Sequence, residues 1–140
     1  MATKYSPKII TNGLVLSLDA ANNKSYPRSG TTWTDLSGNN NTGTLTNGPT
    51  FSNVNGGSIV FDGTNDYVPI GTSGFPFGSS AGTLSVWAKT NTISSGYIWI
   101  VSYGTALGSQ SRFLGINSSL APYVLANERE SVDICSIAFE

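Results

Sequence analysis

An acidic turn is the first stretch of this sequence whose residue types could do chemistry. Asp62, Asn65 and Asp66 lie close together and offer carboxylate and amide oxygens, the ligands that Ca²⁺ takes in flexible geometry. The same residue types form plain turns, because Asx side chains bond to nearby backbone amides. A calcium site therefore remains one interpretation, with Asp35 and Asn39 as further candidate ligands. We favour the plain turn, since no D-x-D-x-D-G loop is present.

Aromatic side chains are the second group that could bind a ligand, by stacking against sugar rings. We expect Trp33, Tyr26 and Tyr67 to lie in or beside loops, where their rings could form such a platform. Trp87 and Trp99 lie within strand patterns instead. Because buried aromatic residues dominate protein cores, we predict that these two tryptophans belong to the core.

Catalytic chemistry has little support in the sequence. The chain has no histidine, which excludes Ser-His-Asp and Cys-His mechanisms. Glycosidases place two carboxylates on either side of the substrate, whereas Asp62 and Asp66 share one turn. The single cysteine, Cys135, excludes an internal disulfide and fits a small buried apolar residue. We therefore predict that the protein is not an enzyme and has no resident cofactor, calcium being the one candidate.

Composition indicates a turn-rich all-β protein. The 140 residues are 39% hydrophobic and 11% charged, with 16 glycines and a net charge of −1. Val, Ile, Thr and aromatic residues suit strands, and Gly and Asn suit turns. The hydrophobic fraction argues against a disordered chain. The near-neutral charge gives no basic surface for nucleic acid or for an anionic membrane.

No targeting or membrane-spanning segment is recognisable. No apolar run approaches the ~20 residues that a spanning helix needs. The first residues lack the apolar core of a signal peptide, so we expect no export by the usual secretion route. An extracellular destination would then require another route, such as release inside a virion.

Short strands separated by turns are expected along the chain. Residues 14–18 and 83–89 alternate apolar with polar positions, which predicts half-buried strands. Residues 97–103 are almost continuously apolar, which predicts a strand buried on both faces. Residues 58–61 and 67–70 flank the acidic turn, and we expect them to pair as an antiparallel hairpin. Further strands are expected at 44–47, 112–116 and 123–125.

These elements predict an antiparallel β-sandwich or barrel with little helix, since no stretch shows a 3.6-residue apolar period. Residues 1–12 form an extended N-terminal arm in this prediction, and residues 13–127 form the sandwich. Residues 128–140 form a divergent C-terminal tail or edge strand. All three glutamates lie in this last segment, and no glycine follows Gly115.

Five stretches together resemble a known domain family. They read G-L-V-L-S-L-D-A at 13–20, W-T-D-L-S-G-N at 33–39, G-T-L at 43–45, I-V-F-D-G-T-N-D-Y-V at 59–68 and T-L-S-V-W-A-K at 83–89. In this order they resemble the concanavalin A-like, laminin-G-type (LamG) domain. The similar form recurs in structural proteins of bacteriophages, especially those of cyanobacteria and marine hosts. The resemblance covers residues 13–117.

The resemblance implies a jelly roll of two antiparallel sheets, here truncated at its C-terminal end. A truncated sandwich leaves an unpaired strand edge, which invites pairing with another chain. The implied function is that of a non-enzymatic virion structural protein on the particle surface, either a capsid decoration (cement) protein or a tail-associated subunit. Its implied partners are major capsid or tail proteins and sister copies.

The same family includes sugar-binding members, so fold alone does not decide the function. The alternative is a lectin-like module that recognises host surface glycans. In that case Trp33, Tyr26 and Tyr67 would contact the sugar, and Asp62, Asn65 and Asp66 could hold Ca²⁺.

Overall fold

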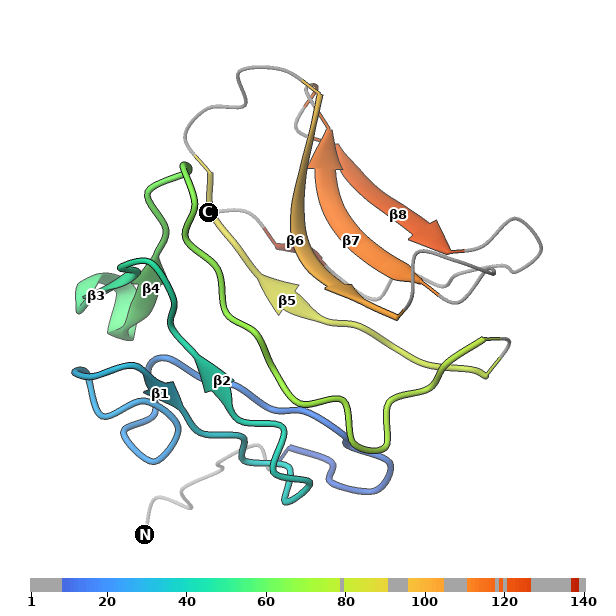
Figure 1. The fold of residues 1–140 in the computed structure, drawn as a ribbon, viewed down its shortest axis with the longest axis horizontal. Helices are drawn as coiled ribbons and strands as arrows, with labels where there is room; N and C mark the ends of the chain where they lie inside the picture. The colour runs from blue at the N-terminus through green and yellow to red at the C-terminus, as the bar shows by residue number, and fades with distance from the viewer. Residues whose placement is uncertain are drawn as a thin grey trace, which may run out of the picture. The chain divides into compact units, whose positions relative to one another are not determined.

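A computed structural model of the chain describes residues 9–78, 80–90, 96–104, 111–117, 119, 121–126 and 137–138 (Figure 1). Most of the predicted arm at 1–12 lies outside these residues, as does the predicted tail at 128–140, Cys135 included, except for a two-residue strand. Strands, turns and one short 3₁₀ turn make up the described residues, with no α-helix among them, so the all-β prediction is confirmed. A helix long and apolar enough to span a membrane is not found in the described part.

The chain divides into two compact units, Met1–Phe75 and Pro76–Glu140. Each unit has its own sheets. The predicted sandwich at 13–127 extends over both units.

The first unit contains two small antiparallel sheets. Strand β1 (Thr32–Trp33) pairs with β2 (Gly43–Thr44). Strand β3 (Thr50–Ser52) pairs with β4 (Ser58–Val60). A 3₁₀ turn, η1 (Val54–Gly56), closes the second pair and contains positive φ angles, which asparagine and glycine tolerate better than other residues.

The hairpin predicted across the acidic turn is wrong. Strand β4 pairs with the strand that precedes it, and Phe51 lies opposite Ile59. Tyr67 instead forms an isolated antiparallel bridge with Thr46, whose N–H donates to the Tyr67 carbonyl at 2.9 Å. The local closure by η1 gives β4 a partner only a few residues away. The acidic loop therefore connects two different pairings rather than the two arms of one hairpin.

The strand predicted at 14–18 is also not formed as a ladder strand. The Ser17 carbonyl accepts the Leu36 N–H at 2.9 Å, but the Ser17 N–H donates to the side chain of Asp35. The Asp35 side chain thus takes the place of the neighbouring strand that a ladder would supply. The alternation of apolar and polar residues does not show that a side chain will pair with this backbone.

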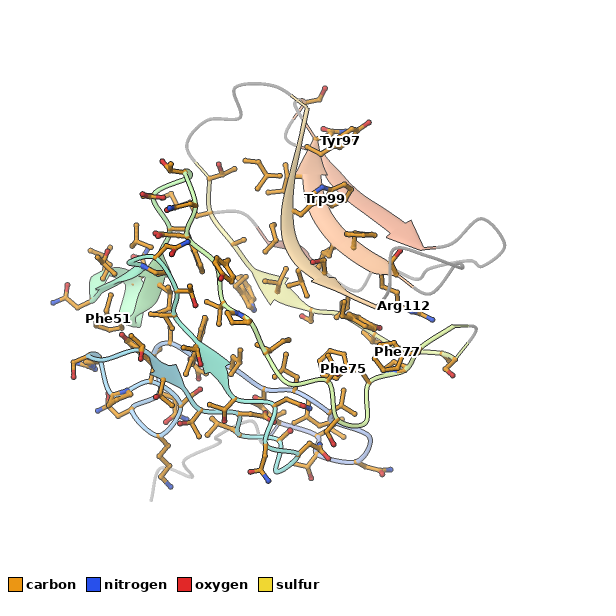
Figure 2. The ribbon with its side chains drawn as sticks, in the orientation of Figure 1. Phe51, Phe75, Phe77, Tyr97, Trp99 and Arg112 are labelled. Atoms are coloured by element: carbon orange, nitrogen blue, oxygen red, sulfur yellow. The ribbon has the colours of Figure 1, made fainter. Side chains whose placement is uncertain are left out.

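Aromatic rings form the core of the first unit around Tyr26. The Tyr26 ring lies 5.8 Å from Phe51 and 6.5 Å from Trp33, centroid to centroid. The Arg28 guanidinium lies 5.8 Å from the Phe51 centroid, on a residue with positive φ. Phe51 is labelled in Figure 2 on β3. These contacts connect the loop after residue 22 to β1 and β3.

The second unit is built around a three-stranded antiparallel sheet. Its strands are β6 (Tyr97–Tyr103), β7 (Arg112–Asn117) and β8 (Pro122–Ala126), in that order. The strands predicted at 97–103, 112–116 and 123–125 are therefore confirmed. Separately, β5 (Val86–Trp87) pairs in parallel with β9 (Ile137–Ala138).

One face of the three-stranded sheet is buried. Leu114, Ile116 and Tyr103 are almost inaccessible to solvent, and Phe77 contacts the Tyr103 ring edge-on at 6.0 Å. Arg112 holds the segment that contains Phe77, because its Nη2 donates to the carbonyls of Gly78 and Ser80 (Figure 2). These two bonds anchor the carbonyls of Gly78 and Ser80 to β7.

Candidate binding surface

The acidic turn uses its side chains to hold its own backbone. The Thr64 N–H donates to Asp62 Oδ1 at 2.8 Å, and the Asp62 N–H donates to Asp66 Oδ2 at 3.0 Å. The Asn65 carbonyl accepts a hydrogen bond of 2.7 Å from Asn47 Nδ2. The turn therefore has the backbone-capping geometry that Asx residues favour.

The same turn leaves one carboxylate oxygen in an unusual setting. Asp66 Oδ1 is buried and has no hydrogen-bond partner, although buried acceptors normally have one. Calcium takes six to eight oxygen ligands, so this one oxygen supplies only a small part of a coordination sphere. The described residues contain no group of three or more His, Cys, Asp or Glu side chains placed to hold a metal.

Asp35 is the hub of a polar cluster in the first unit. Its buried carboxylate accepts hydrogen bonds at Oδ1 from the N–H groups of Ser17 and Ser37, and at Oδ2 from the Ser37 hydroxyl and the Asn41 N–H. Burial acts to raise the pKa of Asp35, but these donors outweigh it and hold the pKa below its ordinary value of 3.8. Both carboxylate oxygens accept hydrogen bonds from the protein, so Asp35 has a structural role. This corrects the interpretation of Asp35 as a further calcium ligand.

Asn39, the other further candidate, belongs to the same cluster. Its Nδ2 donates to the Leu14 carbonyl at 3.0 Å and to the Ser37 hydroxyl at 3.2 Å. These bonds tie the loop after β1 to the segment at 14–18. The W-T-D-L-S-G-N motif thus has a structural role. We call its hydrogen-bonded side chains, Asp35, Ser37 and Asn39, the polar clamp.

Two of the three predicted sugar-contacting rings lie in the core cluster of the first unit. Tyr26 is only 2% exposed, and its hydroxyl donates to the Gly30 carbonyl at 2.7 Å. Trp33 is half-buried against Tyr26, and its indole nitrogen is buried without a hydrogen-bond partner. The expected open position of Tyr26 is corrected, because the loop after Pro27 folds back to bond its hydroxyl.

Tyr67 is the predicted ring that does reach solvent. Its side chain is 52% exposed, while its backbone bridges Thr46. Tyr67 follows the acidic turn directly, so the predicted sugar and metal residues Tyr67 and Asp66 are neighbours in the chain. A single exposed ring offers one stacking face.

A larger aromatic surface lies on the second unit, along β6 (Figure 2). Tyr97 and Trp99 are 53% and 42% exposed, and their rings stack with centroids 5.8 Å apart and planes at 16°. Trp99 also contacts Phe113 at 5.0 Å. The prediction that β6 is buried on both faces is therefore wrong, and so is the core assignment of Trp99.

Gly115 makes room for this arrangement on the neighbouring strand. It lies opposite Trp99 in the β6–β7 register, and a Cβ built on it would lie 3.0 Å from Trp99 Cε3 and would clash with the Ile98 carbonyl. The indole therefore covers the glycine backbone. An i, i+2 pair of aromatic residues opposite a strand glycine is the sequence signal that would have indicated an aromatic face.

Trp87 on β5 is the most exposed large ring among the described residues, at 77%. Its core assignment is wrong. Residues 84–90 alternate between half-buried and exposed positions, with Leu84 and Val86 on the half-buried side. In the sequence, Trp87 already alternates with Leu84 and Val86 and so falls on the same face as the polar residues. This alternation predicts its exposure better than the general preference of tryptophan for protein cores does.

Comparison of the chain with models of protein families, with curated proteins and with solved structures gives no match. The resemblance of residues 13–117 to laminin-G-type domains therefore remains a prediction that rests on its motif residues.

Proposed function

We propose that this chain is a non-enzymatic structural protein of a bacteriophage particle, acting as a capsid decoration or cement protein or as a tail-associated subunit. It acts by docking exposed apolar side chains against capsid or tail proteins and against sister copies. The observation that carries the proposal is the exposure of Trp87, Tyr97 and Trp99 on one unit of a chain whose net charge is −1. Aromatic residues are enriched at protein interfaces and often dominate their binding energy.

Magnitudes favour a docking role for these rings. Full burial of a large apolar side chain contributes about 2–3 kcal/mol. Tyr97 and Trp99 are already about half-buried, so burial of the remaining surface of the three rings contributes less than three times this value and offsets part of the entropic cost of association. With 11% charged residues, the chain carries few groups that would oppose desolvation of an interface.

The proposed architecture is the two-sheet jelly roll implied by the laminin-G-type motifs. The motifs alone carry this architecture, since the described strands form two-stranded sheets and one three-stranded sheet. The edges of these sheets that the same chain does not cover can pair with another chain. The proposed location is the virion surface, with no nucleic acid or membrane as partner.

The test is whether the chain is an integral part of particles of the phage that encodes it. We expect mass spectrometry to detect the chain in gradient-purified, salt-washed particles at a fixed ratio to the major capsid protein. Trp87→Ser should lower that ratio severalfold, while the matched control Thr83→Ser, another exposed position before β5, should not. Absence of the chain from washed particles would overturn the proposal.

A carbohydrate-binding module is the second candidate, and the exposed Tyr97–Trp99 pair favours it. Sugar rings stack on solvent-facing aromatic residues, and Tyr67 beside the acidic turn offers a further ring. A glycan array with and without chelator distinguishes the two candidates. Chelator-sensitive binding would support a role for Asp62, Asn65 and Asp66 as calcium ligands, and binding in neither condition would exclude the lectin-like function.

A further inference from the structure

Three asparagines of this chain are followed directly by glycine, at positions 12–13, 47–48 and 55–56. Such pairs can rearrange spontaneously, because the glycine nitrogen can attack the asparagine side chain with little steric hindrance. The reaction also requires a side-chain amide that is free to turn toward the backbone and water that can reach it. All three pairs lie in described parts of the first unit, and Asn47 and Asn55 differ in how their side chains are held.

Asn47 is restrained. Its side-chain nitrogen donates to the Asn65 carbonyl at 2.7 Å. This bond restrains the side-chain rotation that attack by the Gly48 nitrogen requires. The next residue, Pro49, restricts the backbone further.

Asn55 differs from Asn47 in its side chain. Both residues are exposed and both have positive φ, 54° at Asn55 in η1, but the Asn55 side chain has no hydrogen-bond partner among the residues that the structure describes. The two residues that follow, Gly56 and Gly57, both have positive φ.

We propose that Asn55 is a site of spontaneous deamidation and isoaspartate formation in the folded protein, whereas Asn47 is protected. The Gly56 nitrogen loses its proton to a solvent base and bonds to Cγ of Asn55, and the side-chain nitrogen leaves as ammonia. Water then opens the succinimide ring at either carbonyl, which produces aspartate or isoaspartate. Water is the only co-reactant, and no electrons are exchanged.

The structure also gives this modification a consequence. Isoaspartate adds a methylene group to the main chain within the turn that joins β3 to β4. Gly57 is in tight contact with the preceding loop, because a Cβ built on it would lie 2.9 Å from Ala21 Cα and 3.1 Å from the Ala20 carbonyl. A longer main chain at residue 55 displaces Gly57 from this contact and weakens the β3–β4 pairing. The pairing therefore has a limited chemical lifetime.

Peptide mapping of the full folded chain during incubation at mildly alkaline pH tests this proposal, with isoaspartyl methyltransferase labelling to detect isoaspartate. We expect the Asn55 peptide to convert at least severalfold faster than the Asn47 peptide. In urea the two rates should become similar, because the Asn47 hydrogen bond is lost. Equal rates in the folded chain, or faster conversion at Asn47, would overturn the proposal.

Asn55→Gly is the matched variant, because glycine accepts the same φ and has no side-chain amide that could be lost. The midpoint of thermal unfolding should fall during incubation of the original chain and stay constant in N55G. If both chains lose stability at the same rate, the β3–β4 turn is not the affected site and the proposed consequence is wrong.

Discussion

The side chain of Asn41 pairs with the backbone of Ser73 as a neighbouring strand would. Asn41 Oδ1 accepts the Ser73 N–H at 2.7 Å, and Asn41 Nδ2 donates to the Ser73 carbonyl at 2.8 Å. The same Nδ2 donates to the Val15 carbonyl at 2.8 Å. One buried amide thus connects two segments that have no backbone ladder between them.

Close approach of the main chain accompanies this pairing. A Cβ built on Gly71 would lie 2.7 Å from Asn41 Oδ1 and 3.0 Å from Asn41 Cα, so only glycine fits at that position. The Asn41 N–H donates to the Asp35 carboxylate, which joins the pairing to the polar clamp. The clamp and the amide form one network, and partial loss of such a network is costly.

The first prediction concerns Asn41→Asp. The carboxylate keeps the shape of the amide but places an acceptor against the carbonyls of Val15 and Ser73, which then lack donors. We expect the free energy of unfolding to fall by about 3–5 kcal/mol, as for an uncompensated buried charge. Chemical denaturation measures this. The neighbouring exposed Asn40→Asp is the matched control, and an equal loss in both variants would contradict the role given to Asn41.

The second prediction concerns acid stability through Asp35. Its pKa is lowered in the folded state, so the unfolded chain binds more protons between the folded value and 3.8. The contribution of Asp35 is therefore fully present above 3.8 and is lost as the pH falls through the folded pKa. Unfolding measured from neutral to strongly acidic pH should show this loss. Asp35→Asn should be less stable at neutral pH and should lose less stability on acidification; an unchanged acid limb would contradict the prediction.

The third prediction compares Tyr26 and Tyr67, which the sequence analysis assigns to the same sugar-contacting group. Tyr26→Phe removes the bond to the Gly30 carbonyl and should cost about 1 kcal/mol of unfolding free energy. Tyr67→Phe, at an exposed position, should change it by less than about 0.5 kcal/mol. Urea unfolding of both variants measures the difference. A larger effect at Tyr67 would show that its hydroxyl has a structural role.

Much of the second unit could be predicted from sequence. The strands at 97–103 and 112–116 were found because continuous apolar and β-branched runs determine a strand without help from distant residues. Which face of β6 is exposed could not be read in the same way, because Tyr97, Ile98 and Trp99 are all apolar. The decisive feature is Gly115 on another strand, whose missing side chain leaves room for the Trp99 indole.

The first unit was harder to predict, because polar side chains replace backbone partners there. Residues 14–18 have the alternation of a strand, yet Ser17 bonds to the Asp35 side chain. The sequence identifies the acidic turn as a turn, but it does not identify the strands that pair on either side of it. The reason is that η1 gives β4 a nearer partner, β3, than residues 67–70. Pairing depends on competition between turns, and a single run of residues does not contain that information.

The fourth prediction tests the packing of Trp99 on Gly115. Gly115→Ala places a methyl group 3.0 Å from the indole and against the Ile98 carbonyl, so either the ring or β6 must move. We expect a loss of about 3 kcal/mol in unfolding free energy, because strand backbone cannot yield as a flexible side chain can. Trp99 fluorescence should also shift, since its contact with Phe113 changes. Ser102→Ala, at an exposed position of β6, is the control and should cost less than about 0.5 kcal/mol. If Gly115→Ala is as stable as that control, the close contact between the two strands at this position does not exist in solution.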